Sequence, residues 1–192
     1  MSGAQRRSVI LGTGSELPSK VVTNHDLEKM VETSDEWITV RTGIKERRVL
    51  EEGKGNADMA FRAAQRALKD AQMQATELDA IIMGTVTPDY PFPSSACVLE
   101  DMLGARNVFS FDVGAACSGF LNALSVADSF IRTGQINNAL VVGSDALSRL
   151  LNWQDRGTCI LFGDGAGAVV LGASQNGSGI LSTRLRTDGS YV

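Results

Sequence analysis

The residue of this sequence most suited to chemistry is Cys117, which lies in the segment FSFDVGAACSGFLNAL. A strand-like run leads into the small residues Gly114, Ala115 and Ala116, and a helical pattern begins near Ser118. A thiol in the first turn of a helix feels the positive end of the helix dipole, which favours the nucleophilic thiolate. Free N–H groups at the same turn can hydrogen-bond the oxyanion that forms when a thioester carbonyl is attacked. The pattern indicates a cysteine nucleophile for acyl transfer.

Packing is the alternative role for a cysteine, because a free thiol is among the most buried of side chains. We assign packing to Cys97 and Cys159, whereas the context of Cys117 leaves both roles open. Three cysteines without C-x-x-C spacing, and one histidine distant from them along the chain, argue against a disulfide framework and a zinc site. That histidine, His25, is expected to be a solvated residue in the first turn of a helix capped by Asn24.

A second group of residues has the chemistry to bind a nucleotide. Thr33 and Glu36 have capping-box spacing, which predicts a helix from Ser34 that carries Trp37 and Arg41 on one face. An indole beside a guanidinium can stack on a purine and bind a phosphate. From spacing alone, the simpler interpretation is a half-buried tryptophan covered by an arginine stem.

The cations that follow this helix are interpreted as a solvated charge run outside the site. They are Lys45, Arg47 and Arg48.

These residues must be positioned by alternating strands and helices. Strands are expected at 8–12, 80–86, 108–113, 139–143, 158–162, 166–171 and 180–185. The clearest helices are predicted at 56–71, with Asn56 as N-cap, and at 118–132. The alternation predicts an α/β fold with right-handed crossovers and a mainly parallel sheet covered by helices on both faces. Residues 163–165 separate two strand-like runs, which predicts a hairpin, an antiparallel edge and hence a mixed sheet.

The amino-acid composition excludes several classes of binding partner. The 192 residues are 43% hydrophobic, which favours a folded core over disorder, and the net charge of −4 provides no field for nucleic acid or an anionic membrane. No apolar run approaches the roughly 20 residues of a membrane-spanning helix, and the amino terminus has no hydrophobic signal core. The sequence therefore predicts a cytoplasmic protein without nucleic-acid or membrane partners and without a bound metal.

Six segments together resemble the amino-terminal part of the β-ketoacyl-acyl-carrier-protein synthase III family. They are TSDEWITVRTGIKERR (33–48), FPSSACVLEDMLG (92–104), FDVGAACSGFLNALSVAD (111–128), ALVVGSDALS (139–148), DRGT (155–158) and FGDGAGAVVL (162–171). The resemblance implies a thiolase-like fold, with this chain as the amino-terminal half of a duplicated five-layer architecture. Residues 1–178 would form the half that carries the nucleophile. Residues 179–192 would start the connection to a carboxy-terminal half that is absent.

The resemblance also implies an activity, the initiating condensation of fatty acid synthesis. Cys117 would take an acyl group from acyl-CoA, and the carbanion from decarboxylation of malonyl-acyl-carrier-protein would then attack the acyl-enzyme. The products would be 3-oxoacyl-acyl-carrier-protein and CO2. Acyl-CoA would be a substrate, and no cofactor would be bound permanently. The family's catalytic histidine and asparagine come from its carboxy-terminal half, so the 192-residue chain alone is expected not to condense.

Site residues are implied in the same way. Trp37 and Arg41 match the residues that contact the CoA nucleotide, Arg156 matches the adenine-stacking arginine, and Thr33 matches a residue near the base. Phe92, which lies between two prolines, matches a residue that closes the partner's acyl pocket across a homodimer.

Three alternatives stay open. The first is an elongation synthase primed by carrier protein, which would have little use for a nucleotide clamp. The second is a thiolase-fold condensing enzyme or acyltransferase of secondary metabolism. The third is a non-catalytic fragment or partner subunit.

Overall fold

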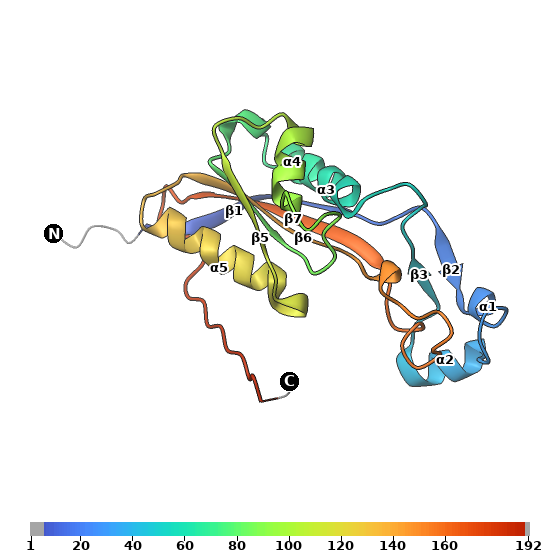
Figure 1. Cartoon of the computed structure of the whole chain (residues 1–192). Helices are drawn as coiled ribbons and strands as arrows, with labels where there is room; N and C mark the ends of the chain where they lie inside the picture. Colours follow the sequence, from blue (N-terminus) through green and yellow to red (C-terminus); the bar gives the residue numbers. More distant parts are fainter. Residues whose placement is uncertain (1–5, 191–192) are drawn as a thin grey trace.

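A computed structural model describes residues 6–190 of the chain and contains a five-stranded sheet and a two-stranded sheet (Figure 1). The elements are β1 (Ser8–Glu16), β2 (Val21–Thr23), α1 (Asn24–Leu27), α2 (Asp35–Thr42), β3 (Glu46–Arg48), α3 (Asn56–Asp70), η1 (Ala75–Glu77), β4 (Ala80–Gly84), α4 (Ser95–Leu103), β5 (Phe109–Val113), η2 (Ala116–Ser118), α5 (Gly119–Arg132), β6 (Asn138–Ala146), η3 (Leu147–Arg149) and β7 (Asp164–Ala173).

The large sheet has the strand order β1-β7-β6-β4-β5. The neighbours β6, β4 and β5 run parallel, whereas β7 is antiparallel to both β6 and β1. The expected mixed α/β sheet is confirmed, but its four pairings divide evenly between parallel and antiparallel, so "mainly parallel" was too strong. Helices α3 and α4 cover one face and α5 covers the other, as Figure 1 shows.

Helix α3 approaches the sheet closely because its inner face is built from alanines. Ala60, Ala63, Ala64 and Ala67 are fully buried against the sheet. Strand β1 contributes Gly12 at this contact, where a Cβ atom would lie 2.5 Å from the carbonyl oxygen of Ala67. The helical spacing of these alanines therefore creates a packing surface that lets the helix lie close to the sheet.

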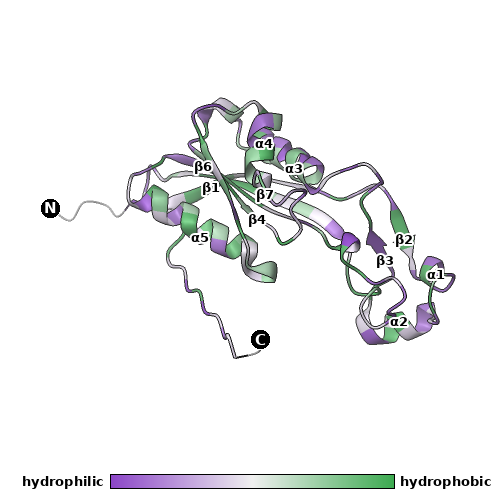
Figure 2. Cartoon of the chain, viewed as in Figure 1, coloured by the Kyte–Doolittle hydropathy of each residue, from purple (hydrophilic) through white to green (hydrophobic). Residues whose placement is uncertain are grey.

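A smaller lobe, formed by β2, β3, α1, α2 and the loop after η3, has its own core. Leu27, Ile38, Cys159 and Ile160 are buried there, and the half-buried Trp37 packs against them. Figure 2 shows hydrophobic residues gathered along the strands of the large sheet, whereas β3 in the small lobe is hydrophilic. No apolar residue of this core belongs to the cores on either face of the large sheet, so among residues 6–190 the lobe packs around a separate core.

Three expected helix starts are displaced by one residue. The hydroxyl of Ser34, not Thr33, accepts the N-cap hydrogen bond of α2, from the amide of Trp37. In α3 the N-cap is Gly55, because the side chain of Asn56 is turned into a buried network described below. In α1 the cap is Thr23 rather than Asn24.

Two expected strands are wrong. Residues 158–162 form turns, because the carboxylate of Asp155 accepts bonds from the Gly157 amide and the Thr158 hydroxyl and closes the chain locally. The expected hairpin at 163–165 is therefore also wrong, and β7 pairs with β6 across the loop that follows η3.

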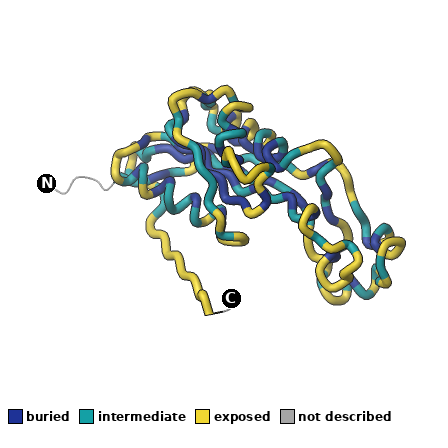
Figure 3. Tube along the Cα trace, viewed as in Figure 1, coloured by how far each residue is buried: buried dark blue, intermediate teal, exposed yellow. Residues whose placement is uncertain are grey.

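Residues 180–185 do not form a strand either. Only the Ile180 amide bonds to the sheet, at the Ser8 carbonyl, and the segment then runs exposed, as the yellow carboxy-terminal stretch in Figure 3 shows. A strand needs a neighbour along its length, which the described chain does not offer this segment. Within residues 6–190, no helix has the length and apolar character to cross a membrane.

Candidate active site

Cys117 lies on a strained turn between β5 and α5. The preceding residue, Ala116, has φ +43°, a left-handed conformation that costs a residue with a Cβ about 1–3 kcal/mol. Residues 116–118 form the single turn η2, and α5 begins directly after it at Gly119. The thiol is exposed. The strand-to-helix elbow expected from the sequence is therefore confirmed, with a short 3-10 turn before the helix.

Two close approaches between α5 and the sheet fix the height of this elbow. Gly84, the last residue of β4, lies so near α5 that a Cβ there would be 2.6 Å from the Phe120 amide nitrogen. The space beside Gly143 of β6 is occupied by the Phe120 side chain, whose Cβ would lie 3.1 Å from a Cβ added at the glycine. Cys117 borders a shallow cavity of about 240 Å³ at the ends of β4 and β6, lined also by both glycines and by Phe120.

The amides of the elbow divide into two groups. The N–H groups of Ser118 and Gly119 donate to the carbonyls of Ala115 and Ala116. The Cys117 N–H has no protein acceptor among residues 6–190. An amide beside the nucleophile without an internal partner is what stabilises an oxyanion in acyl transfer, at about 2.7–4 kcal/mol per donor.

The three cysteines differ in environment. Cys159 is buried in the core of the small lobe, and burial raises the pKa of its thiol. Cys97 is half-buried in α4, where its thiol contacts the Ser94 hydroxyl and the Ser110 carbonyl. Their predicted packing roles fit these surroundings. Cys117 alone of the three is exposed beside a cavity.

In the small lobe, Trp37 is flanked by two guanidinium groups. The Cζ atom of Arg41 lies 4.2 Å from the centre of the indole, and that of Arg156 lies 4.9 Å from it. Arg41 comes from the same helix, whereas Arg156 comes from the loop after η3 and also donates to the Glu32 carbonyl. Both arginines are exposed, so the structure brings together an aromatic surface and two accessible cations.

The remaining predicted residues lie apart from one another. Thr33 is half-buried, and its hydroxyl has no hydrogen-bond partner within residues 6–190. Phe92 is 84% exposed on the loop between β4 and α4 and does not line the Cys117 cavity. His25 is exposed on α1, where its ring lies 3.2 Å from Glu28, which agrees with the expected solvated role.

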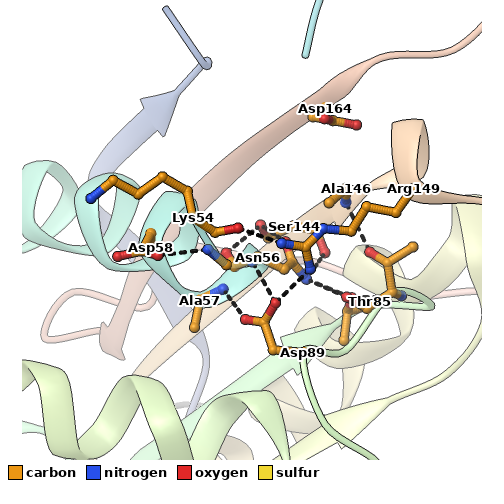
Figure 4. Close-up of polar contacts among 12 residues, drawn as sticks. Lys54, Asn56, Ala57, Asp58, Thr85, Asp89, Ser144, Ala146, Arg149 and Asp164 are labelled. Carbon is orange, nitrogen blue, oxygen red and sulfur yellow. Dashed lines mark hydrogen bonds and ion pairs between the residues drawn. The ribbon is translucent and has the colours of Figure 1, made fainter. Parts of the chain in front are cut away.

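The loop that carries Phe92 is anchored to the sheet by a buried polar network (Figure 4). The side-chain nitrogen of Asn56 donates to the Thr85 hydroxyl and to the Ser144 carbonyl, each at 3.0 Å. Asp89 accepts from the first two amides of α3, each at 2.8 Å, and from Arg149. Burial disfavours the Asp89 carboxylate, but these bonds prevail and hold its pKa below the usual range.

The sequence analysis missed the structural roles of Asn56, Asp89 and Arg47. Asn56 was interpreted only as an N-cap and Asp89 was not singled out, because the partners that reveal their roles lie about 30 or more residues away along the chain. Arg47 was interpreted as solvated, yet it is 6% exposed. It is the middle residue of a three-residue strand, between the exposed Glu46 and the half-buried Arg48, and the alternation of side chains along a strand could have revealed that it points inward. Within residues 6–190, no three His, Cys, Asp or Glu side chains are arranged to hold a metal ion.

Comparison with known proteins identifies relatives across most of the chain. A family profile described as 3-oxoacyl-[acyl-carrier-protein (ACP)] synthase III matches residues 111–189. A β-ketoacyl-[acyl-carrier-protein] synthase III of Caldanaerobacter subterraneus is 54% identical over 94% of this chain and 55% of its own length. One from Laribacter hongkongensis is 57% identical over 95% of this chain and 57% of its own length. The chain thus spans somewhat more than half the length of these relatives.

Solved structures of the same kind of enzyme also resemble this chain. The crystal structure of 3-oxoacyl-[acyl-carrier-protein] synthase III from Aquifex aeolicus superposes with a TM-score of 0.92 at 54% identity, over 95% of this chain and 59% of that one. A priming β-ketosynthase from the R1128 polyketide pathway superposes with a TM-score of 0.85 at 36% identity, over 91% of this chain and 52% of that one. The thiolase-like fold expected from the sequence is confirmed.

Proposed function

This chain belongs to the β-ketoacyl-acyl-carrier-protein synthase III family, and from that premise we propose that it carries the acyl-accepting part of an enzyme that initiates fatty acid synthesis. In this proposal Cys117 attacks the thioester carbonyl of acyl-CoA. The C–S bond to CoA breaks, the acyl group moves to the cysteine sulfur, and CoA leaves as the thiol. Malonyl-acyl-carrier-protein then decarboxylates, and its carbanion takes the acyl group to give 3-oxoacyl-acyl-carrier-protein.

The observation that carries the proposal is the exposed thiol of Cys117 on a strained elbow, next to an amide without a protein acceptor. The left-handed Ala116 holds the sulfur above the ends of β4 and β6, where a planar thioester can approach. The free N–H of Cys117 then supplies one donor for the oxyanion. A buried structural cysteine would need neither feature.

Substrate selection is assigned to the small lobe. Trp37, Arg41 and Arg156 form a nucleotide clamp, in which an indole plane and two cations meet the purine and the phosphates of CoA. Thr33 is assigned a place near the base by the family resemblance, and its buried hydroxyl has no hydrogen-bond partner within residues 6–190. Acyl-CoA is a substrate in this scheme, and no cofactor stays bound.

Condensation requires groups outside these 192 residues. The only histidine, His25, is exposed on α1 and paired with Glu28, so it does not serve a carbanion at Cys117. We therefore assign acylation to this chain and the decarboxylating histidine and asparagine to the remainder of the family's length. Residues 1–178 form the acyl-accepting half, and 179–192 begin the connection to the other half.

The protein is proposed to work as a cytoplasmic homodimer. Phe92 is the anchor of that proposal, because a large ring that is 84% exposed on a firmly tethered loop is suited to insertion into a partner. In the partner it would close the acyl pocket and limit the length of the starter.

The test is the intact mass of the full-length protein before and after incubation with acetyl-CoA, with Cys117→Ser in parallel. The expected result is a gain of one acetyl group that is absent from the variant. A folded protein that gains no acetyl group would refute the acyl-accepting role.

A condensing enzyme of secondary metabolism is the second candidate, favoured by the likeness to the R1128 priming β-ketosynthase. The two candidates differ in starter. Competition between acetyl-CoA and longer acyl-CoA thioesters for Cys117 separates them, since a fatty-acid-initiating enzyme with a closed pocket should prefer short starters.

A further inference from the structure

Arg47 has an environment that the acylation chemistry does not explain. It belongs to the three-residue strand β3 and is 6% exposed, whereas its neighbour Glu46 is exposed and Arg48 is half-buried. Among residues 6–190, no carboxylate lies within 4.0 Å of its guanidinium. A buried cation is costly unless its donors are well used, so its contacts indicate what it stabilises.

Those contacts join three separate segments of the small lobe. The guanidinium donates to the Val22 carbonyl of β2 at 3.0 Å, to the Asn24 side-chain oxygen of α1 at 2.9 Å, and to the Ile160 carbonyl at 3.2 Å. Ile160 is 113 positions along the chain from Arg47. The arginine fork presents these donors on two separate nitrogens of a rigid plane, whereas an ammonium group presents its three donors from a single nitrogen.

The contact with Ile160 fixes the loop that supplies Arg156. From Asp155 to Ile160 the chain is folded on itself, because the amides of Thr158 and Cys159 both donate to the Asp155 carbonyl. The Asp155 side chain closes the same turn through Thr158. Arg156 lies inside this bonded unit, so anchoring its end at Ile160 places the Arg156 guanidinium relative to Trp37.

The contact with Asn24 fixes the helix that supplies the rest of the clamp. The side-chain nitrogen of Asn24 donates to the Asp35 carboxylate at 2.8 Å and to the Ile44 carbonyl at 2.7 Å. Asp35 opens α2, and Ile44 follows its end. Asn24 therefore holds both ends of the helix that carries Trp37 and Arg41, while its oxygen is held by Arg47.

We propose that Arg47, acting through Asn24 and the Ile160 carbonyl, is the positioning residue that sets the two sides of the nucleotide clamp at their working distance. The inference rests on the proposed function. Arg47 touches neither CoA nor the reacting atoms. It acts on substrate binding and leaves the thiol untouched, since the contacts it makes lie within the small lobe.

The test compares two acyl donors in the active full-length protein. Acetyl-CoA carries the nucleotide, whereas acetyl-pantetheine carries the same thioester without it. Arg47→Met should raise the KM for acetyl-CoA about tenfold, the size of a lost cation–π contact in a partly desolvated site. The KM for acetyl-pantetheine and the kcat with both donors should stay at wild-type values.

Arg48→Met is the matched control. Arg48 is on the same strand, but its guanidinium donates to the Pro18 carbonyl and pairs with Glu46, away from the clamp. The KM for both donors should be unchanged in this variant. If the Arg47→Met variant does not fold, Arg47→Lys is measured in its place, because lysine keeps the positive charge and lacks the guanidinium group. This variant should show a smaller rise in the KM for acetyl-CoA and no change in the KM for acetyl-pantetheine.

Three results would overturn the inference. One is an Arg47 variant that folds and keeps the wild-type KM for acetyl-CoA. Another is an equal rise for both donors, which would indicate a general loss of structure. The third is a wild-type protein that takes acetyl from acetyl-pantetheine but never from acetyl-CoA, which refutes the nucleotide clamp itself and, with it, this role of Arg47.

Discussion

The elbow at Cys117 and the clamp at Trp37 are built in opposite ways. The elbow is made by backbone, through a left-handed alanine and glycines that allow a helix to approach a strand. The clamp is made by side chains, through an indole and two guanidinium groups held by a small separate core. Backbone placement gives one fixed position for a reacting atom, whereas long side chains give adaptable contacts with a large substrate.

The difference predicts a division of labour. Changes at the elbow should alter the rate of acyl transfer from every donor. Changes at the clamp should alter the concentration dependence for donors that contain the nucleotide.

The largest effect is expected from Cys117→Ala. Without the sulfur no acyl-enzyme forms, so acyl transfer should fall by at least about 10⁴-fold with any donor, as for other lost nucleophiles. Binding of CoA should be unchanged, measured by isothermal titration calorimetry. A variant that also loses CoA binding would show that the two regions are not separate.

Gly84→Ala should have the next largest effect. The added Cβ would meet the backbone at the start of α5, 2.6 Å from the Phe120 nitrogen, and would push the elbow off its position. Acyl transfer from acetyl-CoA and acetyl-pantetheine should fall about 100-fold alike, since a displacement of about 1 Å is enough. Gly167→Ala is the control, because a Cβ there meets nothing within 4 Å. A loss confined to acetyl-CoA would contradict the division.

Trp37→Ala should have a smaller and selective effect. Removing the indole takes away the stacking surface and the partner of both guanidinium groups. The KM for acetyl-CoA should rise about tenfold. The KM for acetyl-pantetheine and the kcat with both donors should stay at wild-type values. Trp153→Phe controls for loss of a tryptophan from the same lobe. A fall in kcat with both donors would mean that the clamp also shapes the reacting centre.

The smallest effect is expected at Asp89, which supports the Phe92 loop. Asp89→Asn should lower the stability at pH 7 by about 1 kcal/mol, as for a lost helix cap, seen as a drop of about 2–4 °C in melting temperature. The folded-state pKa of Asp89 lies below its unfolded value of about 3.9, so its contribution is present above that value and is lost as the pH falls through the folded-state pKa.

Thermal melts of both proteins from pH 7 to pH 3 check this sign. The gap in melting temperature should be full at pH 5 and above and should narrow toward pH 3. A gap that widens on acidification would show that Asp89 is not held as a carboxylate.

The sequence predicted those parts of the molecule that depend on local pattern. The nucleophile elbow, the alanine face of α3 and the proximity of Trp37 to Arg41 all follow from spacing within one segment. Arg156 was assigned to the same nucleotide site as Trp37 only by family resemblance, because the two residues lie 119 positions apart along the chain and no periodicity connects them.

Two of the failures have a common physical cause. Residues 158–162 have strand-like composition, but local bonds to Asp155 compete with pairing and win. Arg47 has the charge of a surface residue, but carbonyls from distant segments satisfy it inside the lobe. In both cases polar partners decided the outcome, and hydrophobic periodicity does not report such partners.

The most direct measurement is a tryptic map of the full-length protein after brief exposure to radiolabelled acetyl-CoA. Trypsin separates the three cysteines of this chain into peptides 70–106, 107–132 and 157–184. The acetyl label should appear on 107–132, which carries Cys117, and should be released by hydroxylamine as a thioester is. A label on either of the other two cysteine peptides, or on none, would contradict the assignment of Cys117 as the acyl acceptor.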